Sequence, residues 1–191
     1  MILICDTCSV LMLIRIAPEM FCDPQYECVT INKVYREIFQ SSRFKNKYPW
    51  RAQFKSKIIT LGTTAENTPD IQQKYKIVEN LAETKELINK KTGRSFDLSK
   101  TDKEIAACAL ALKYAVSTVE HDLTDFLGQE FDIRVIRPLA VINYWLRKGI
   151  IEWDEYKQGV LEDWAINEGA TSSKRDIQKF EELTVRAYPK R

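Results

Sequence analysis

The sequence contains a single histidine, His121, among its 191 residues. One histidine excludes a nuclease that uses a histidine pair as acid and base, and it excludes a histidine-rich zinc site. The patterns GxxxxGK and GxGxxG, which hold nucleotide phosphates on glycine-rich loops, are also absent. His121 stands between two acids in an expected turn, and this setting favours a surface residue, with substrate contact as the alternative.

Long apolar runs are absent as well. The first one, residues 1–4, is stopped by Asp6, and no stretch approaches the roughly 18 apolar residues of a membrane span. We therefore expect neither a signal peptide nor a membrane anchor. The five cysteines are an odd number without the framework of a small secreted domain, so we expect a cytoplasmic protein that needs no disulfides.

Hydrophobic residues make up 45% of the chain and charged residues 29%, which is typical of a folded domain with its own core. The net charge of +2 is small, but the charges are unevenly distributed. Residues 38–65 contain no acid and six cations: Arg43, Lys45, Lys47, Arg51, Lys55 and Lys57. This basic stretch predicts a local positive field.

Short apolar segments alternate with helical patterns along most of the chain. ILIC (2–5) is too short and too apolar for an amphipathic helix, so it predicts a buried strand. Further strands are expected at ECVTI (27–31), AVST (115–118) and IRVI (133–136), with a helical turn between the last two, while KIITL (57–61) is either a strand or a helix end. The alternation predicts the α/β class, with a mainly parallel sheet covered by helices on both faces.

The helices expected between these strands begin at residues that favour helix starts. Asn32 can cap a helix over residues 32–40, and Ser99 can cap the alanine-rich helix that follows it. Pro138 opens a further helix. A long polar helix is expected over residues 71–91, with four core contacts: Ile77, Leu81, Leu87 and Ile88.

The C-terminal part of the chain lies beyond the alternating pattern. Residues 150–191 predict two helices separated near Gly169, with Ser172 or Ser173 as the cap of the second. We therefore expect an α/β domain over residues 1–149 and a C-terminal helical extension over residues 150–191. Four aromatic side chains of the extension are available for burial or for a dimer or partner surface: Trp153, Tyr156, Trp164 and Phe180.

Acids recur where the carboxyl ends of these strands are expected, which is where open parallel sheets bind ligands. Carboxylates gathered at one place repel one another unless a cation lies among them. Hard divalent ions such as Mg²⁺ or Mn²⁺ meet that need, and they activate water beside a phosphate. The pattern therefore indicates a metal-dependent phosphodiesterase whose candidate residues are Asp6, Glu37, Asp102, Glu120 and Asp122.

Each acid also has a purely structural explanation. Asp6 can start a turn or cap the next helix, and Asp102 stands three residues after Ser99, as in a capping box. Glu120 can belong to a polar turn. Glu37 is harder to explain in this way, because it lies at the edge of an apolar stripe, where a solvated glutamate is unusual. The recurrence of carboxylates at one sheet edge favours a shared site over separate explanations.

Four motifs, in this order, resemble those of the PIN-domain ribonucleases, a family that includes the VapC-type toxins of toxin–antitoxin pairs. They are ILICDTCSVL (2–11), VYREI (34–38), LSKTDKEIAACAL (98–110) and STVEHDL (117–123). Their order and spacing match over residues 1–147. The resemblance implies a three-layer α/β/α PIN-like fold with a short parallel sheet, and the activity of a metal-dependent endoribonuclease.

The resemblance also implies roles for individual residues. The catalytic carboxylates would be Asp6, Glu37, Asp102, Glu120 and Asp122. The ligands of Mg²⁺ or Mn²⁺ would be Asp6, Asp102 and Glu120, supported by the hydroxyl-bearing residues Thr7, Ser9 and Thr118. Glu120 stands where the family has aspartate, so either its longer side chain reaches the metal or Asp122 takes its place. RNA would be the substrate, with a cognate antitoxin and a second copy of the chain as protein partners.

The basic stretch has two possible roles. Five of its cations are candidates for RNA contacts: Arg43, Lys45, Lys47, Arg51 and Lys55. They alternate with Phe44, Tyr48, Trp50 and Phe54, an arrangement that suits phosphate contacts combined with stacking on unpaired bases. Alternatively, the aromatic rings face the core or a partner subunit while the cations solubilise the outer face.

Two other interpretations stay open. A PIN-like scaffold that has lost its activity would bind RNA or a protein without cleaving anything, and Glu120 in place of aspartate is its best support. The cysteines Cys5, Cys8, Cys22 and Cys28 suggest a zinc or redox site, which is disfavoured because Cys5 lies within an expected buried strand.

Overall fold

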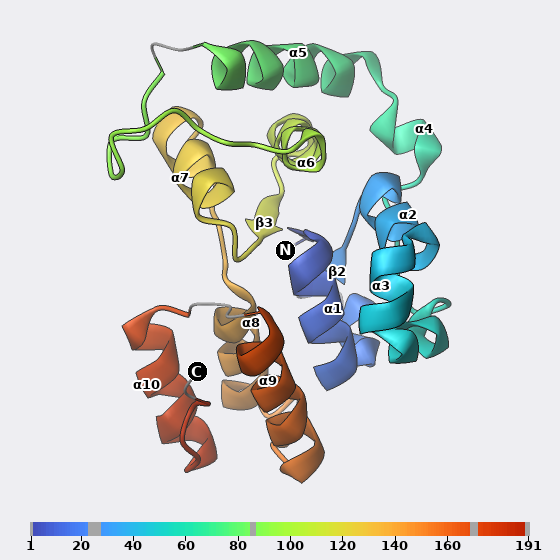
Figure 1. Ribbon diagram of the computed structural model, residues 1–191, viewed down its shortest axis with the longest axis vertical. Helices are drawn as coiled ribbons and strands as arrows, with labels where there is room; N and C mark the ends of the chain where they lie inside the picture. The colour runs from blue at the N-terminus through green and yellow to red at the C-terminus, as the bar shows by residue number, and fades with distance from the viewer. Residues whose placement is uncertain (1, 23–27, 85–86, 169–171, 190–191) are drawn as a thin grey trace.

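The centre of the computed structural model, which describes residues 2–22, 28–84, 87–168 and 172–189, is a parallel sheet. Its strands are β1 (Leu3–Cys5), β2 (Cys28–Val29) and β3 (Ala115–Ser117), in the order β2-β1-β3. Every residue of these strands is buried. Helices surround the sheet (Figure 1), so the α/β class is confirmed and is compatible with three layers.

Two parallel bridges extend the sheet at its edges. Thr60 pairs with Thr30 beyond β2, so the KIITL segment joins the sheet rather than ending a helix. Val135 pairs with Val116 beyond β3, so IRVI contributes one bridge and not the full strand that its sequence predicts. Since the chain leaves β1 toward β2 on one side and returns to β3 on the other, the carboxyl ends of β1 and β3 form a topological switch point.

The first helices follow directly from β1 and β2. They are α1 (Thr7–Ile16), η1 (Pro18–Cys22), α2 (Asn32–Gln40), α3 (Ser42–Lys47), η2 (Pro49–Phe54) and α4 (Thr63–Glu66). The expected capping by Asn32 is wrong, because Asn32 is the first helical residue and Ile31 precedes it without a side-chain cap. The Asn32 amide instead donates to Thr63 Oγ1 (3.4 Å), which links α2 to α4.

The middle of the chain forms α5 (Pro69–Glu83), α6 (Lys100–Leu112) and α7 (His121–Glu130). The predicted helix over residues 71–91 is wrong beyond Glu83, since Ile88 instead forms an antiparallel bridge with Ser95. Ile88 and Ile77 are exposed, so neither is the core contact that the pattern predicted, and residues 85–86 lie outside the described part. The turn expected after AVST is a full helix, α7.

The C-terminal helices are α8 (Pro138–Arg147), α9 (Glu155–Glu168) and α10 (Lys174–Thr184). Ser173 caps α10 through the Asp176 backbone N–H (3.0 Å), while the expected break at Gly169 lies outside the described residues. Helix α9 packs on α1 and α10 packs on α8. Trp164 and Phe180 belong to the same buried cluster as β1, so the extension shares the core of the α/β part. No helix within the described ranges is long and apolar enough to cross a membrane.

Candidate active site

Asp6 lies at the switch point and joins β1 to β3. Its backbone N–H donates to Ser117 O (3.0 Å), and its side chain is 5% exposed. The carboxylate oxygen Oδ1 accepts from the Ser9 N–H (2.7 Å) and Oδ2 accepts from Thr118 Oγ1 (2.6 Å). Asp6 therefore caps α1, as the structural explanation requires, and it also connects the ends of two strands.

Burial gives the Asp6 carboxyl an unusual proton affinity. Desolvation raises the pKa of Asp6 to about 6, against the lowering effect of the hydrogen bonds from Thr118 and Ser9. The negative charge of Asp102 raises this pKa further. The carboxylate of Asp6 is thus held by neutral donors in a place where a cation would stabilise it.

A cleft of about 480 Å³ opens at this sheet edge. Its described lining contains one guanidinium, that of Arg43, and five carboxylates from separate parts of the chain: Asp6, Glu37, Asp97, Asp102 and Glu120. The structure therefore brings together four of the five carboxylates expected from the sequence.

Glu37 reaches the cleft from α2 and is half-buried. Thr7 Oγ1 donates to Glu37 Oε2 (2.9 Å), so the first turn of α1 fixes the position of this side chain. The sequence assigned Thr7 or Ser9 to support Asp6. In the structure the two roles are divided, since Ser9 holds Asp6 and Thr7 holds Glu37.

Asp102 enters the cleft from the first turn of α6. Its Oδ2 accepts from the Ser99 N–H (3.0 Å), and its own N–H donates to Ser99 Oγ (3.1 Å). This is the capping box that the spacing predicts. The structural explanation and the site are compatible here, because the box fixes where the carboxylate stands at the cleft wall.

Glu120 follows β3 and precedes α7. Its backbone N–H donates to Thr118 Oγ1 (2.9 Å), so one hydroxyl holds both the Asp6 carboxylate and the start of this segment. Partial burial raises the pKa of Glu120, and the charge of Asp102 raises it further. The longer side chain of Glu120 does line the cleft.

Asp122 is placed differently from the sequence expectation, because it does not line this cleft within the described residues. Its Oδ1 accepts from Asn89 Nδ2 (3.4 Å), and its Oδ2 accepts from the Asp97 N–H (3.2 Å). Asp122 thus holds the loop that carries Asp97, which the sequence analysis did not single out. The local signal was an acid between two buried apolar residues, Phe96 and Leu98.

The five cations proposed for RNA contacts divide into three groups. Arg43 lines the cleft, while Lys45, Lys47 and Lys55 are exposed on α3 and just after η2. Arg51 is wrong as an RNA contact because it is buried, where its guanidinium donates to two backbone carbonyls, Ile38 O (2.5 Å) and Tyr48 O (3.3 Å).

The aromatic rings of the basic stretch pack against one another. Phe44 and Tyr48 are buried and stacked, with centroids 5.8 Å apart and an interplanar angle of 19°. Trp50 continues this row by an edge contact to Tyr48 (5.7 Å) and carries the guanidinium of Arg15 over its face. The alternative in which the aromatic rings face the core therefore describes this stretch better than base stacking does.

Among the described side chains, Cys5, Cys8 and Cys28 are free thiols and form no cage for zinc. Cys5 and Cys28 are buried in neighbouring strands, and burial raises the pKa of the Cys5 thiol, which disfavours the thiolate that zinc binding needs. The side chain of Cys22 lies outside the described residues.

The donor set of the cleft fits a hydrated hard cation. None of the ion pairs formed between described residues uses Asp6, Glu37, Asp102 or Glu120. No three of the described His, Cys, Asp or Glu side chains form a ready-made cage for a metal ion. Mg²⁺ suits such a site, because it binds through one or two carboxylates and keeps several of its waters.

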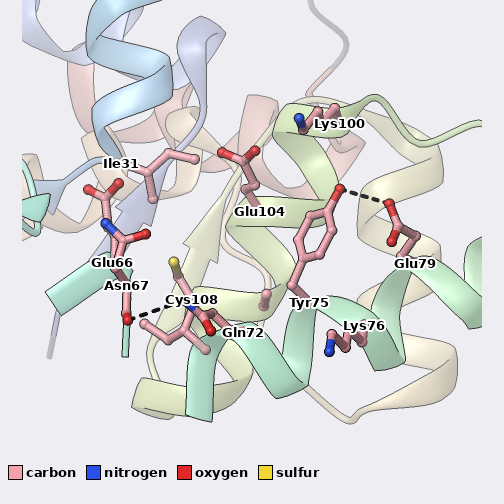
Figure 2. A pocket seen from close by; sticks show the side chains of 12 residues that line it. Ile31, Glu66, Asn67, Gln72, Tyr75, Lys76, Glu79, Lys100, Glu104 and Cys108 are labelled. Carbon is pink, nitrogen blue, oxygen red and sulfur yellow. Dashed lines mark hydrogen bonds between the residues drawn. The ribbon is translucent and has the colours of Figure 1, made fainter. Parts of the chain in front are cut away.

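A second acidic cavity of about 480 Å³ lies beside α5 and α6, away from the switch point. Figure 2 shows Glu66, Glu79 and Glu104 along its walls. Each carboxylate has a partner, since the Asn32 backbone N–H donates to Glu66 (2.8 Å), Tyr75 Oη donates to Glu79 (3.0 Å) and Lys33 Nζ forms an ion pair with Glu104 (3.0 Å). This cavity carries none of the candidate catalytic residues and is a weaker candidate for the active site.

Comparison of the chain with protein-family models, with curated proteins and with solved structures finds no match in any of the three. A function must therefore be argued from the motifs of the sequence and from the geometry of this cleft.

Proposed function

We propose that this protein is a metal-dependent endoribonuclease with a PIN-like fold, which hydrolyses phosphodiester bonds of RNA at the acidic cleft. One observation carries the proposal. Asp6, Glu37, Asp102 and Glu120 come from four separate segments and line a single cleft at the switch point of a parallel sheet. The four motifs that resemble the PIN-domain ribonucleases contain these same residues, in the same order.

In this proposal Asp6, Asp102 and Glu120 hold Mg²⁺ or Mn²⁺. The bound ion would lower the pKa of a water and neutralise charge on the phosphate. Thr118 positions two of these ligands at once, because its hydroxyl contacts both the Asp6 carboxylate and the Glu120 backbone. Burying the Asp6 carboxylate among neutral donors destabilises the metal-free protein, and a bound cation would remove this destabilisation.

Glu37 and Arg43 act on the reactants. Glu37, held by Thr7, accepts the proton of the water that attacks phosphorus in line. The bond between phosphorus and the leaving ribose oxygen breaks, and that oxygen takes a proton from solvent water. Arg43 binds a phosphate oxygen at the cleft wall, as guanidinium groups do well. The remaining cleft carboxylate, Asp97, faces the same space and is available to orient metal-bound water.

The same motifs support a biological role as the toxin of a toxin–antitoxin pair in the cytoplasm. In that role a cognate antitoxin would bind the protein and suppress cleavage, and a second copy of the chain would complete a homodimer. Expression of the chain alone, compared with its Asp6→Asn variant, tests this role by growth. Equal growth of both strains would contradict it.

The activity is tested by incubating the purified protein with single-stranded and structured RNA in Mg²⁺, Mn²⁺ or chelator. We expect cleavage that requires the ion and falls by at least about 100-fold in Asp6→Asn and in Asp102→Asn. Asp132→Asn is the matched control, because Asp132 is exposed, lies outside the cleft and has a positive φ that asparagine tolerates. Cleavage that survives both cleft substitutions defeats the proposed site.

Glu120 decides between the enzyme and the second candidate, a non-catalytic PIN-like module that binds RNA or a protein. The observation that favours the module is Glu120, which stands where the PIN-domain ribonucleases have aspartate. If the proposal is correct, Glu120→Asp retains cleavage and Glu120→Gln loses it. RNA binding without cleavage, across all metals and substrates, favours the module.

A further inference from the structure

A basic cavity of about 550 Å³ lies where α8 and α10 meet the chain that follows β3. The sequence analysis did not single out any of its charged residues. Its described lining contains one acid, Asp176, and five cations from three segments: Arg134, Arg137, Arg147, Arg175 and Lys179. Such an excess of positive charge in a concave surface predicts an anionic ligand.

The walls of this cavity are held in place by the tertiary structure. Asn143 on α8 donates through Nδ2 to Asp176 O on α10 (2.8 Å), which joins the two helices. The carboxylate of Asp176 already accepts from Ser173 Oγ (2.6 Å). Arg175 lies in the first turn of α10, where the helix dipole adds positive potential.

The basic cavity is a neighbour of the acidic cleft along the same edge of the sheet. Arg137 follows the segment that pairs in parallel with β3, so it stands at the carboxyl edge, as Glu120 does. Its guanidinium lies 3.5 Å from His121 Nδ1, and His121 directly follows the cleft residue Glu120. A polymer that enters the cleft therefore has a short route to the cavity.

We propose that this cavity binds backbone phosphates of a single-stranded RNA whose neighbouring phosphodiester bond occupies the acidic cleft. The inference rests on the proposed function. A cleft with five carboxylates and one guanidinium repels a polyanion, so affinity for RNA needs cations next to the cleft in addition to Arg43. The basic stretch of residues 38–65 supplies less than its sequence suggests, since Arg51 is buried in the core. Guanidinium groups match phosphate oxygens in pairs, and the contact of Arg137 with His121 beside the acidic cleft favours RNA over an acidic protein as the ligand.

The test measures binding separately from cleavage. A short fluorescent single-stranded oligoribonucleotide is titrated with the full-length protein in chelator, and anisotropy is followed at several salt concentrations. We expect Arg175→Gln and Lys179→Gln each to weaken binding about fivefold in about 0.1 M salt, because one lost phosphate contact lowers the salt slope by roughly 0.7 for a single strand. Lys174→Gln is the matched control, since Lys174 is exposed on the same turn but does not line the cavity.

The outcomes separate this inference from the proposed function. Binding that depends on Arg175 and Lys179, in a protein that cleaves no RNA with any metal, supports the cavity and defeats the enzyme. If cleavage requires Asp6, but the wild type and the Arg175→Gln/Lys179→Gln double variant bind and cut RNA equally well, the proposed role of the cavity is overturned and the proposed enzyme is not. An equal loss of RNA affinity in Lys174→Gln also overturns the proposed role of the cavity, because the loss would then reflect the net charge of the protein and not a contact inside the cavity. Binding of an acidic protein at the cavity, with unchanged RNA affinity, would overturn it in favour of a protein partner.

Discussion

Replacing Asp6 with asparagine should make the metal-free protein more stable at neutral pH while it destroys the proposed activity. The Asp6 carboxyl is 5% exposed, accepts from Ser9 and Thr118, and forms no ion pair with a described residue. Asparagine has nearly the same shape and keeps the Oδ1 that caps α1. The substitution therefore removes the buried charge with little change in packing.

The magnitude follows from the pKa of Asp6. Its ordinary value is 3.8 and burial raises it to about 6, so ionising this group at pH 7 costs the folded state about 3 kcal/mol. Asparagine avoids that cost. It also turns the bond to Thr118 around, and a hydroxyl that loses its acceptor costs about 1–2 kcal/mol. The expected net gain is about 1–2 kcal/mol in the free energy of unfolding.

The sign of the pH dependence is specific. A carboxyl whose pKa is raised in the folded state contributes stability that is fully present below pH 3.8 and is lost as the pH rises through about 6. Wild type should therefore lose stability relative to Asp6→Asn over this range. Urea unfolding in chelator, from pH 4 to pH 7, measures the difference, with Asp132→Asn as the control for a generic change of charge.

Divalent ions should reverse the order of stability of the wild type and the Asp6→Asn variant. Mg²⁺ or Mn²⁺ added at pH 7 should raise the unfolding midpoint of the wild type more than that of Asp6→Asn, because only the wild type offers the buried carboxylate. The reasoning is refuted if Asp6→Asn is less stable than the wild type at pH 7 and the difference between them does not change with pH. Such a result would mean that the carboxylate is already compensated within the fold.

Three further substitutions test the contacts around the cleft. Thr118→Val removes the hydroxyl that lowers the pKa of Asp6, so we expect the acid limb of the pH–rate profile for RNA cleavage to move to higher pH. An unshifted profile would show that the hydrogen bond from Thr118 does not tune the site. Arg51→Met removes donors to two buried carbonyls, so it should lower the free energy of unfolding by about 2–4 kcal/mol in urea titrations while the RNA affinity of the folded protein stays unchanged. Ser99→Ala breaks the capping box and should lower the free energy of unfolding by about 1 kcal/mol. RNA cleavage should also fall, because Asp102 loses its fixed position. Full cleavage activity would show that the site does not depend on the cap.

Local sequence patterns predicted the parts of the site that depend on short-range geometry. The strand before Asp6 is too apolar and too short for a helix, and it is β1. Ser99 and Asp102 form a capping box because their separation of three residues matches one helical turn, and Ser173 caps α10 for the same reason. Asp6 and Glu120 then meet because the carboxyl ends of the parallel strands β1 and β3 share one edge.

Errors arose where a local pattern competed with contacts to residues outside that pattern. Residues 71–91 have helical periodicity, yet the helix stops at Glu83 and Ile88 pairs with Ser95 instead. Asp122 has the position of a motif residue, but hydrogen bonds from Asn89 and Asp97 hold it away from the cleft.

The sequence by itself determined the strands β1 and β3, the caps at Ser99 and Ser173, and the acids that follow these strands, since all of these depend on residues a few positions apart. Only the tertiary structure decided that Arg51 is buried, that Asp97 joins the cleft, and that α8 and α10 form a basic cavity beside it. The physical reason is chain separation. The Thr118 bond to Asp6 spans 112 residues, and the Asn143 bond to α10 spans 33, so no local pattern in the sequence contains them.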